Sequence, residues 1–180
     1  MNQHNQIDDC NQEIINFGNE MIKTLVIGIS CAIFIAFILG ETIRGCAFLV
    51  LLLPLRQNAG GLHMKTKTGC AIVSALIYIM ALLVLKYVSI PTMVQLILFL
   101  CFAVIFIMLA PVHNSVKKLD MDETNVYGNR ARMILECEAL IFVLFIMQNN
   151  EKWSSVVLCV LIVCTVLLIM GKIKNSIEGV

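Results

Sequence analysis

Long runs without a charged residue are the feature that most constrains the fold of this chain. The first run extends from Thr24 to Gly40, seventeen residues, which is close to the shortest helix that crosses a hydrocarbon core of about 30 Å. Hydrophobic residues make up 59% of the chain and charged residues only 14%, which is not the composition of a soluble domain. Further apolar runs follow it along the chain. We therefore predict an all-α fold, a polytopic bundle of membrane helices.

The apolar and polar runs predict one membrane domain over residues 1–180, with an N-terminal amphipathic helix and about six transmembrane segments. The amphipathic helix is expected at 7–22, where apolar residues recur at spacings of three and four opposite acidic and amide side chains. The membrane segments are expected at 24–40, 43–55, 70–87, 92–110, 133–149 and 153–171. The second segment is short for a full crossing, so it must tilt, thin the bilayer or be re-entrant.

The positions of lysine and arginine indicate the orientation of these segments. With six crossings, ten of the thirteen cations fall on the side of the N-terminus and three on the other side. Because cations are enriched in cytoplasmic loops, we expect both termini, the polar stretch 56–70 and the long connection 112–132 to be cytoplasmic. A net charge of +1 without a basic run gives no reason to expect nucleic acid as a partner.

The stretch 56–70, RQNAGGLHMKTKTGC, contains a cysteine and a histidine in a pattern that suggests catalysis. Cys70 opens an apolar run that should be helical, and His63 lies seven residues before it. Two lysines stand between them. Helix N-termini, cations and histidines each favour the thiolate, which is the reactive form of cysteine. We therefore interpret Cys70 as a nucleophile and His63 as its base, in a reducing compartment that suits a free thiol.

The spacing of His63 and Cys70 limits the backbone between them. Seven residues of straight helix would separate the two side chains by about 10 Å along the axis. A hydrogen bond needs about 3 Å, so residues 63–70 should not form one straight helix. Gly60, Gly61 and Gly69 can take left-handed conformations at little cost, and they are expected to fold His63 back over Cys70.

Four further polar residues are candidate supporting groups, each with a structural alternative. Arg56 is either a membrane anchor or a guanidinium that binds a substrate carboxylate or carbonyl. Gln57 and Asn58 either supply an oxyanion donor, or orient His63, or simply belong to a turn. Glu20 is either a solvated acid at the membrane boundary or a carboxylate that orients the histidine or holds substrate.

Two acids at the start of the fifth segment, Glu136 and Glu138, lie where ionisable groups are costly. At helical spacings of four to six residues, they are expected to pair with Arg130 or Arg132.

A metal site at His63 and Cys70 is the alternative to nucleophilic catalysis. Zinc needs three or four protein ligands, and the remaining candidates lie in unrelated segments: His4, Cys10 and His113. We therefore expect neither a metal nor a cofactor.

Several motifs resemble the accessory gene regulator protein B (AgrB) family of bacterial membrane peptidases. The residues of the stretch that match its pattern R-x-x-x-G-G-x-H-x6-C are Arg56, Gly60, Gly61, His63 and Cys70. Gly18-Asn19-Glu20 resembles the family's G-x-E/Q element. Ala110-Pro111-Val112, with Lys117 and Leu119, resembles its A-P-V-x4-K-x-L loop. The resemblance covers most of the chain.

The resemblance implies a membrane-embedded cysteine endopeptidase that processes a small quorum-sensing pro-peptide. Cys70 would form a thioester as the C-terminal tail leaves, and a cysteine or serine of the substrate would then close a thiolactone or lactone ring. The implied partners are an AgrD-like pro-peptide and the lipid bilayer of the bacterial cell membrane, with the oligomeric state open to a homodimer. An alternative of another class is a small non-enzymatic transporter or assembly subunit, with 56–70 as a gating loop. It predicts polar residues that line a path through the membrane.

Overall fold

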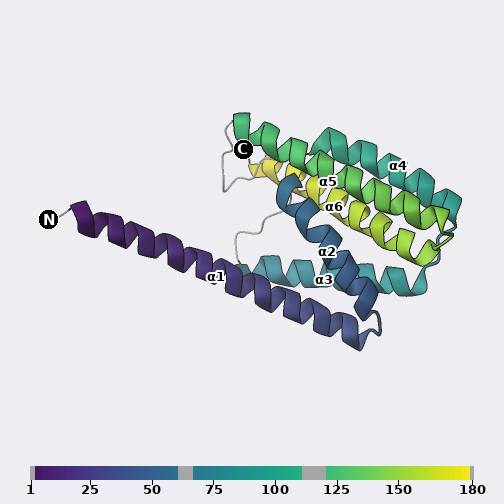
Figure 1. Cartoon of the computed structure of the whole chain (residues 1–180), viewed down its shortest axis with the longest axis horizontal. Helices are drawn as coiled ribbons and strands as arrows, with labels where there is room; N and C mark the ends of the chain where they lie inside the picture. Colours follow the sequence, from purple (N-terminus) through teal and green to yellow (C-terminus); the bar gives the residue numbers. More distant parts are fainter. Residues whose placement is uncertain (1–2, 61–66, 111–120, 179–180) are drawn as a thin grey trace.

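The computed structural model describes residues 3–60, 67–110 and 121–178, and within them the chain is helical apart from short turns. Six α-helices and no strand are found in these ranges (Figure 1). The helices are α1 (Gln3–Ile38), α2 (Thr42–Ala59), α3 (Lys67–Tyr87), α4 (Thr92–Leu109), α5 (Met121–Met147) and α6 (Glu151–Glu178). The predicted all-α class is confirmed.

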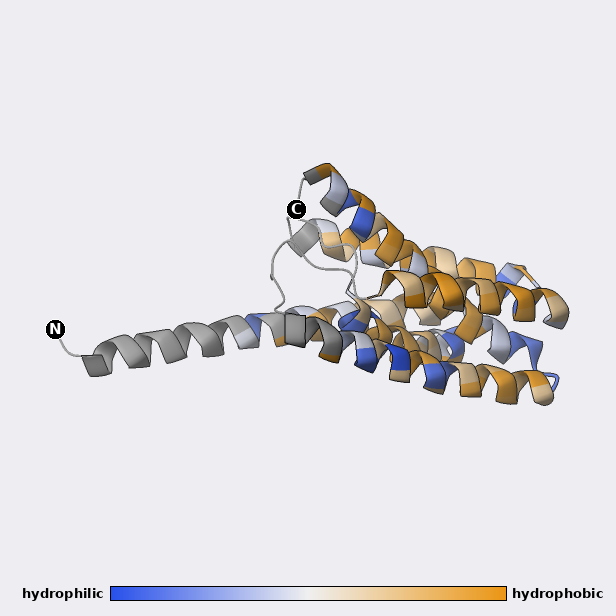
Figure 2. Ribbon diagram, turned by 90° about the horizontal axis from the view of Figure 1, so that it is seen from above, coloured by the Kyte–Doolittle hydropathy of each residue, from blue (hydrophilic) through white to orange (hydrophobic). Residues whose placement is uncertain are grey.

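Four helices in the described part of the chain are long and apolar enough to cross a membrane. Their apolar parts are Gly18–Ile38, Gly69–Tyr87, Thr92–Leu109 and Glu151–Lys174. Figure 2 shows that hydrophobic residues dominate the bundle. The chain is therefore a helical membrane protein. The predicted count of six crossings and the cytoplasmic placement of the termini stay predictions.

The first helix joins two of the expected segments. α1 continues without a break from the expected amphipathic segment 7–22 into the expected first span 24–40, and its N-terminal half extends away from the other helices (Figure 1). Only 6% of the apolar part of α1 is buried, against 56% for α6. The apolar side chains of α1 therefore face outward, as they would toward lipid.

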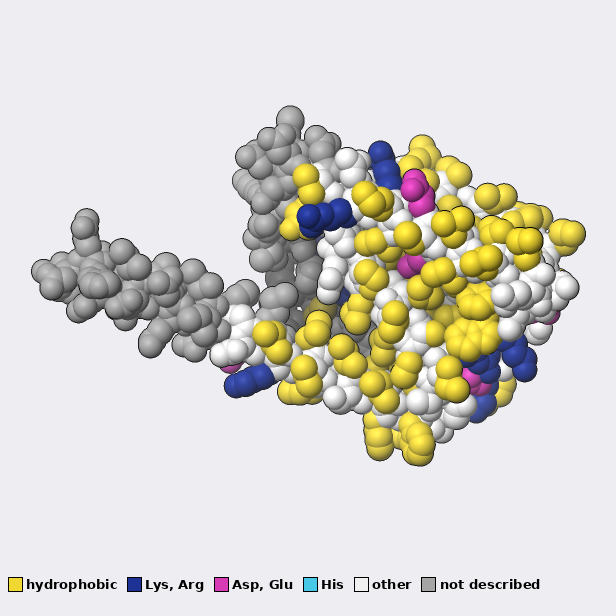
Figure 3. Space-filling model, viewed as in Figure 1, with side chains coloured by type: hydrophobic (Ala, Val, Ile, Leu, Met, Phe, Trp, Pro, Cys, Tyr) yellow, Lys and Arg dark blue, Asp and Glu magenta, His cyan; other side chains and the backbone are white. Residues whose placement is uncertain are grey.

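The core of the bundle is built around α6, which packs against α2, α3, α4 and α5. Large side chains fill the contacts. The rings of Phe99 and Phe142, for example, stack with their centroids 4.2 Å apart. Many apolar side chains remain on the outer face that Figure 3 shows. Such a surface is unusual for a soluble protein and fits a protein surrounded by hydrocarbon.

α2 lies inside the bundle because small and apolar residues line its buried face. The buried positions are Gly45, Phe48, Leu52, Leu55 and Ala59. At Gly45, a Cβ atom would lie 2.5 Å from Tyr78 Oη and 2.7 Å from Ala36 Cβ. Only glycine therefore lets α1, α2 and α3 approach one another at this point. Figure 1 shows α2 inclined to the axes of α5 and α6.

Polar contacts tie the α1–α2 turn to the end of α3. Arg44 and Glu41, which the sequence places in a tight polar connection, form an ion pair with 2.6 Å between Arg44 Nη2 and Glu41 Oε2. Arg44 Nη1 also donates a hydrogen bond to Leu85 O at 2.9 Å, and Lys86 Nζ donates one to Leu39 O at 2.7 Å. These cations satisfy carbonyl groups at two helix C-termini, where positive charge is favourable.

Candidate active site

Cys70 lies in the first turn of α3, which begins at Lys67. Its side chain is half-buried and its thiol is free. The expected partner, His63, and the second glycine of the pair, Gly61, lie outside the described residues. The structure therefore places the predicted nucleophile at a helix start, as expected, and leaves its distance from His63 untested.

Arg56 reaches from the last turn of α2 to α3. Its Nη1 donates a hydrogen bond to Ser74 Oγ at 3.2 Å. Ser74 follows Cys70 by four residues, so the two side chains are neighbours on one face of the helix, with about 6 Å between their Cβ atoms. Arg56 of α2 is thus bonded to α3 one helical turn after Cys70.

Ser74 was not among the residues predicted from the sequence. Apart from Tyr78, it is the one polar side chain on α3 between Cys70 and Lys86. Its spacing of four residues from Cys70 is the feature that could have identified it. Tyr78 continues the same face by one more turn and contacts the ring of Phe48 of α2, with centroids 5.8 Å apart. This face of α3 therefore lies against α2.

The end of α2 shows how three other predicted residues are placed. Gly60 follows the helix with φ of 77°, a left-handed conformation that favours glycine, and its N–H donates to Arg56 O at 3.2 Å. Asn58 Nδ2 donates to Pro54 O at 2.8 Å, a contact within the helix. The side chain of Gln57 is exposed. The Asn58 amide is thus bonded within its own helix, whereas the side chain of Gln57 is open to solvent or ligand.

Glu20 has an exposed side chain on α1, the helix that packs against both α2 and α3. Its backbone carbonyl accepts a hydrogen bond from Thr24 Oγ1 at 2.8 Å.

The predicted pairing of the acids on α5 is wrong for Glu138. Glu138 is 2% exposed, and neither of its carboxylate oxygens has a hydrogen-bond partner among the residues that the structure describes. It shares a buried face with Leu135 and Phe142, whereas Arg130 and Arg132 are exposed on other faces. Glu136 is exposed as well, and among the described residues it forms no ion pair. Helical spacing alone did not show that the two acids face different surroundings.

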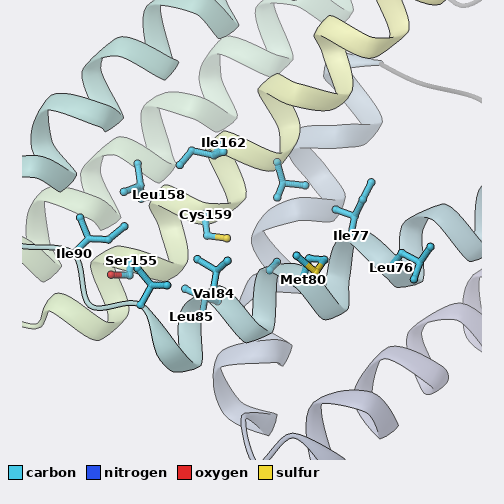
Figure 4. A pocket seen from close by; sticks show the side chains of 13 residues that line it. Leu76, Ile77, Met80, Val84, Leu85, Ile90, Ser155, Leu158, Cys159 and Ile162 are labelled. Carbon is cyan, nitrogen blue, oxygen red and sulfur yellow. The ribbon is translucent and has the colours of Figure 1, made fainter.

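A cavity of about 360 Å³ lies between α3 and α6 (Figure 4). Its walls are almost entirely apolar, with Met80 and Val84 of α3 and Leu158 and Cys159 of α6 among them. None of the predicted site residues that the structure describes lines it. Its polar atoms are the thiol of Cys159 and the hydroxyl of Ser155, which donates to Glu151 O at 2.7 Å.

Among the side chains that the structure describes, no three of histidine, cysteine, aspartate or glutamate are placed to hold a metal ion.

These observations define a class: a helical membrane protein with a free cysteine at the start of an apolar helix and an arginine held one turn away. Comparison with known proteins gives the family. The chain belongs to the accessory gene regulator B family, whose model matches residues 1–170, and the resemblance noted in the motifs is confirmed. It is 34% identical over 132 residues to Protein FsrB of Enterococcus faecalis (strain ATCC 47077 / OG1RF), a match that covers 72% of this chain and 52% of that protein. The chain thus spans about half the length of this relative. No solved structure matches it.

Proposed function

We propose that this protein is a cysteine endopeptidase of the bacterial cell membrane that processes a small quorum-sensing pro-peptide. Membership of the accessory gene regulator B family supports the general role. The observation that supports the site is the hydrogen bond from Arg56 to Ser74, because it holds a guanidinium on the face of α3 that carries Cys70. An arginine beside a cysteine at a helix start is suited to binding a substrate carbonyl or carboxylate near a nucleophile.

The proposed reaction has two steps. His63 takes the proton of Cys70, and the thiolate attacks the carbonyl carbon of one peptide bond. The C–N bond breaks, His63 returns the proton to the leaving amine, and the C-terminal tail departs. Cys70 then carries the remaining peptide as a thioester.

In the second step a cysteine or serine of the substrate attacks that thioester. Its proton passes to His63, the Cys70 thiolate leaves, and a thiolactone or lactone ring closes. A thioester is a higher-energy acyl group than an amide, so net cyclisation is near balance or uphill unless the tail is removed. Added tail peptide should therefore slow net turnover.

The roles proposed for the supporting residues follow from their positions around Cys70. Arg56 binds an oxygen of the substrate, and Gly60 with Gly61 allows the chain after α2 to return toward Cys70. Exposed Gln57 and Glu20 are candidates for contacts with the peptide or with His63. On the predicted orientation the site faces the cytoplasm, where the pro-peptide would lie against the lipid surface.

The test is cleavage of a co-expressed pro-peptide by cysteine variants. Cys70→Ala and Cys70→Ser should each abolish cleavage, since a hydroxyl is a far weaker nucleophile near neutral pH. Cys101→Ala, at an exposed free cysteine on α4, is the matched control and should cleave normally. Mass spectrometry of the wild-type protein should find a substrate fragment on Cys70 that hydroxylamine releases. Wild-type cleavage by Cys70→Ala would refute the assignment.

The transporter alternative finds less support. Buried polar side chains do occur, but Ser154 Oγ donates to Gln95 Oε1 at 2.7 Å, so these two satisfy each other. Gln95 Nε2 in turn donates to Ile90 O at 2.7 Å. This cluster joins α4 to α6. It reaches the cavity described above only at Ser155, whose hydroxyl accepts from Gln95 Nε2 at 3.1 Å and donates to Glu151 O, so these polar groups bond to one another.

A further inference from the structure

The hydroxyl of Ser74 occupies an unusual position for a membrane helix. The residues that follow Cys70 on α3 are apolar for most of their length, and the one short polar side chain among them receives the guanidinium of a neighbouring helix. Both Ser74 and Arg56 are half-buried. A hydrogen bond at a membrane helix contact contributes more to orientation than to stability, since such bonds are worth only about 0.6 kcal/mol on average.

The hydrogen bond to Ser74 orients the guanidinium group of Arg56. Arg56 shares a face of α2 with Leu52 and Ala59, which are buried, so its stem is directed toward the bundle. A guanidinium carries five N–H donors in a rigid fork. When one nitrogen is held by Ser74, the orientation of the whole planar group is restricted. Ser74 itself lies one helical turn after Cys70 on α3.

We propose that Ser74 is a positioning residue of the active site: it holds the Arg56 guanidinium one helical turn from Cys70, so that the free donors of the arginine engage an oxygen of the peptide substrate. The catalytic consequence rests on the function proposed above. The positioning itself does not, because it is a statement about charge near Cys70 in the protein without substrate.

Charge-selective alkylation of Cys70 measures the positioning directly. The protein is prepared in detergent with the exposed cysteines Cys31, Cys101 and Cys137 replaced by alanine. The rates of Cys70 modification by iodoacetate, an anion, and by iodoacetamide, which is neutral, are then compared by peptide mass spectrometry. Both reagents consume the same thiolate, so the ratio of rates reports the local potential and not the fraction ionised.

A guanidinium near a partly solvated thiol should favour the anionic reagent by about threefold, a modest value because water screens the charge. Ser74→Ala should remove most of this preference, Ser74→Thr should retain it, and Arg56→Gln should abolish it. The double variant Ser74→Ala with Arg56→Gln should be no worse than Arg56→Gln alone. Ser89→Ala, at an exposed serine beyond α3, is the control and should leave the ratio unchanged.

Cleavage of the pro-peptide then tests the consequence. In Ser74→Ala we expect a higher KM with little change in kcat, and Ser74→Thr should recover the wild-type KM. An unchanged alkylation ratio in Ser74→Ala would overturn the inference whatever the cleavage result. An unchanged KM alongside a lost ratio would also overturn the role in substrate binding. If the wild-type protein cleaves nothing while the ratio responds as expected, the proposed function fails and the positioning stands.

Discussion

Replacing Gly45 with alanine tests the tightest helix contact of the bundle. The added Cβ atom would lie 2.5 Å from Tyr78 Oη and 2.7 Å from Ala36 Cβ, whereas ordinary contacts begin at 3.4 Å. The shortfalls are about 0.9 Å and 0.7 Å. Tyr78 is buried and Ala36 Cβ is fixed to its backbone, so side-chain rotation cannot relieve both contacts. α1 and α3 must therefore move away from α2.

The cost of such overpacking is about 2 kcal/mol. For a chain of this length it corresponds to a fall in Tm of about 4–8 °C. Thermal unfolding in detergent micelles can be followed by the fluorescence of Trp153, the one tryptophan in the sequence. Gly28→Ala is the matched control, because no described atom beyond the neighbouring residues and the local helix backbone lies within 4 Å of the Cβ position there. It should raise the Tm slightly, since alanine favours a helix over glycine by about 1 kcal/mol.

The Tyr78→Phe variant separates the contact of the new Cβ atom with Tyr78 from its contact with Ala36. The hydroxyl of Tyr78 has no hydrogen-bond partner among the described residues, so Tyr78→Phe alone should be neutral or slightly stabilising. In that background the nearest obstacle to the new Cβ atom is gone, and the penalty of Gly45→Ala should fall by about half, to roughly 1 kcal/mol. The reasoning is refuted if Gly45→Ala unfolds at or above the wild-type temperature, or if Tyr78→Phe leaves its penalty unchanged.

Three further substitutions follow from single contacts. Gln95→Leu should lower the Tm by an amount equivalent to about 1–2 kcal/mol, because Ile90 O and Ser154 Oγ lose a partner; an unchanged Tm would show that the cluster is not stabilising. Glu138→Leu should raise the Tm by the equivalent of about 1–3 kcal/mol, since it removes a buried carboxylate that has no hydrogen-bond partner in the described part of the chain; a lower Tm would show that this acid forms a stabilising interaction. Gly60→Ala should cost about 1 kcal/mol at φ of 77° and slow pro-peptide cleavage, measured by thermal unfolding and by the cleavage assay; wild-type values in both would contradict the role of that turn.

Part of the site could be predicted from residue order. Cys70 stands where a polar stretch meets an apolar run, and such a boundary starts a helix in the structure. Gly60 is predicted from its conformational freedom to let the chain turn, and it takes a left-handed φ in the structure. Arg56 ends the second apolar segment, and this position in the sequence is enough to predict that it lies near the start of the third segment. The histidine at position 63 lies outside the described residues, and its role as a base stays a prediction.

Other parts could not be predicted because helical spacing does not reveal which face turns inward. Glu138 was paired with arginines on spacing alone, yet it faces the core while they face outward. A single serine in an apolar run does not by itself indicate a site residue, and the importance of Ser74 comes from the hydrogen bond that Arg56 donates to it. A membrane helix that is apolar on nearly every side has no polar face, so its sequence does not show which side packs against the other helices.

The sequence alone determined that this chain is a helical membrane protein of a known family, because the length and apolarity of its runs and the order of its motif residues are local properties. Tertiary structure alone decided which side chains meet. Helices of similar apolarity pack by shape and by a few polar contacts and not by the burial of one apolar stripe. The close approach at Gly45, the burial of Glu138 and the bond from Arg56 to Ser74 all arise from that packing.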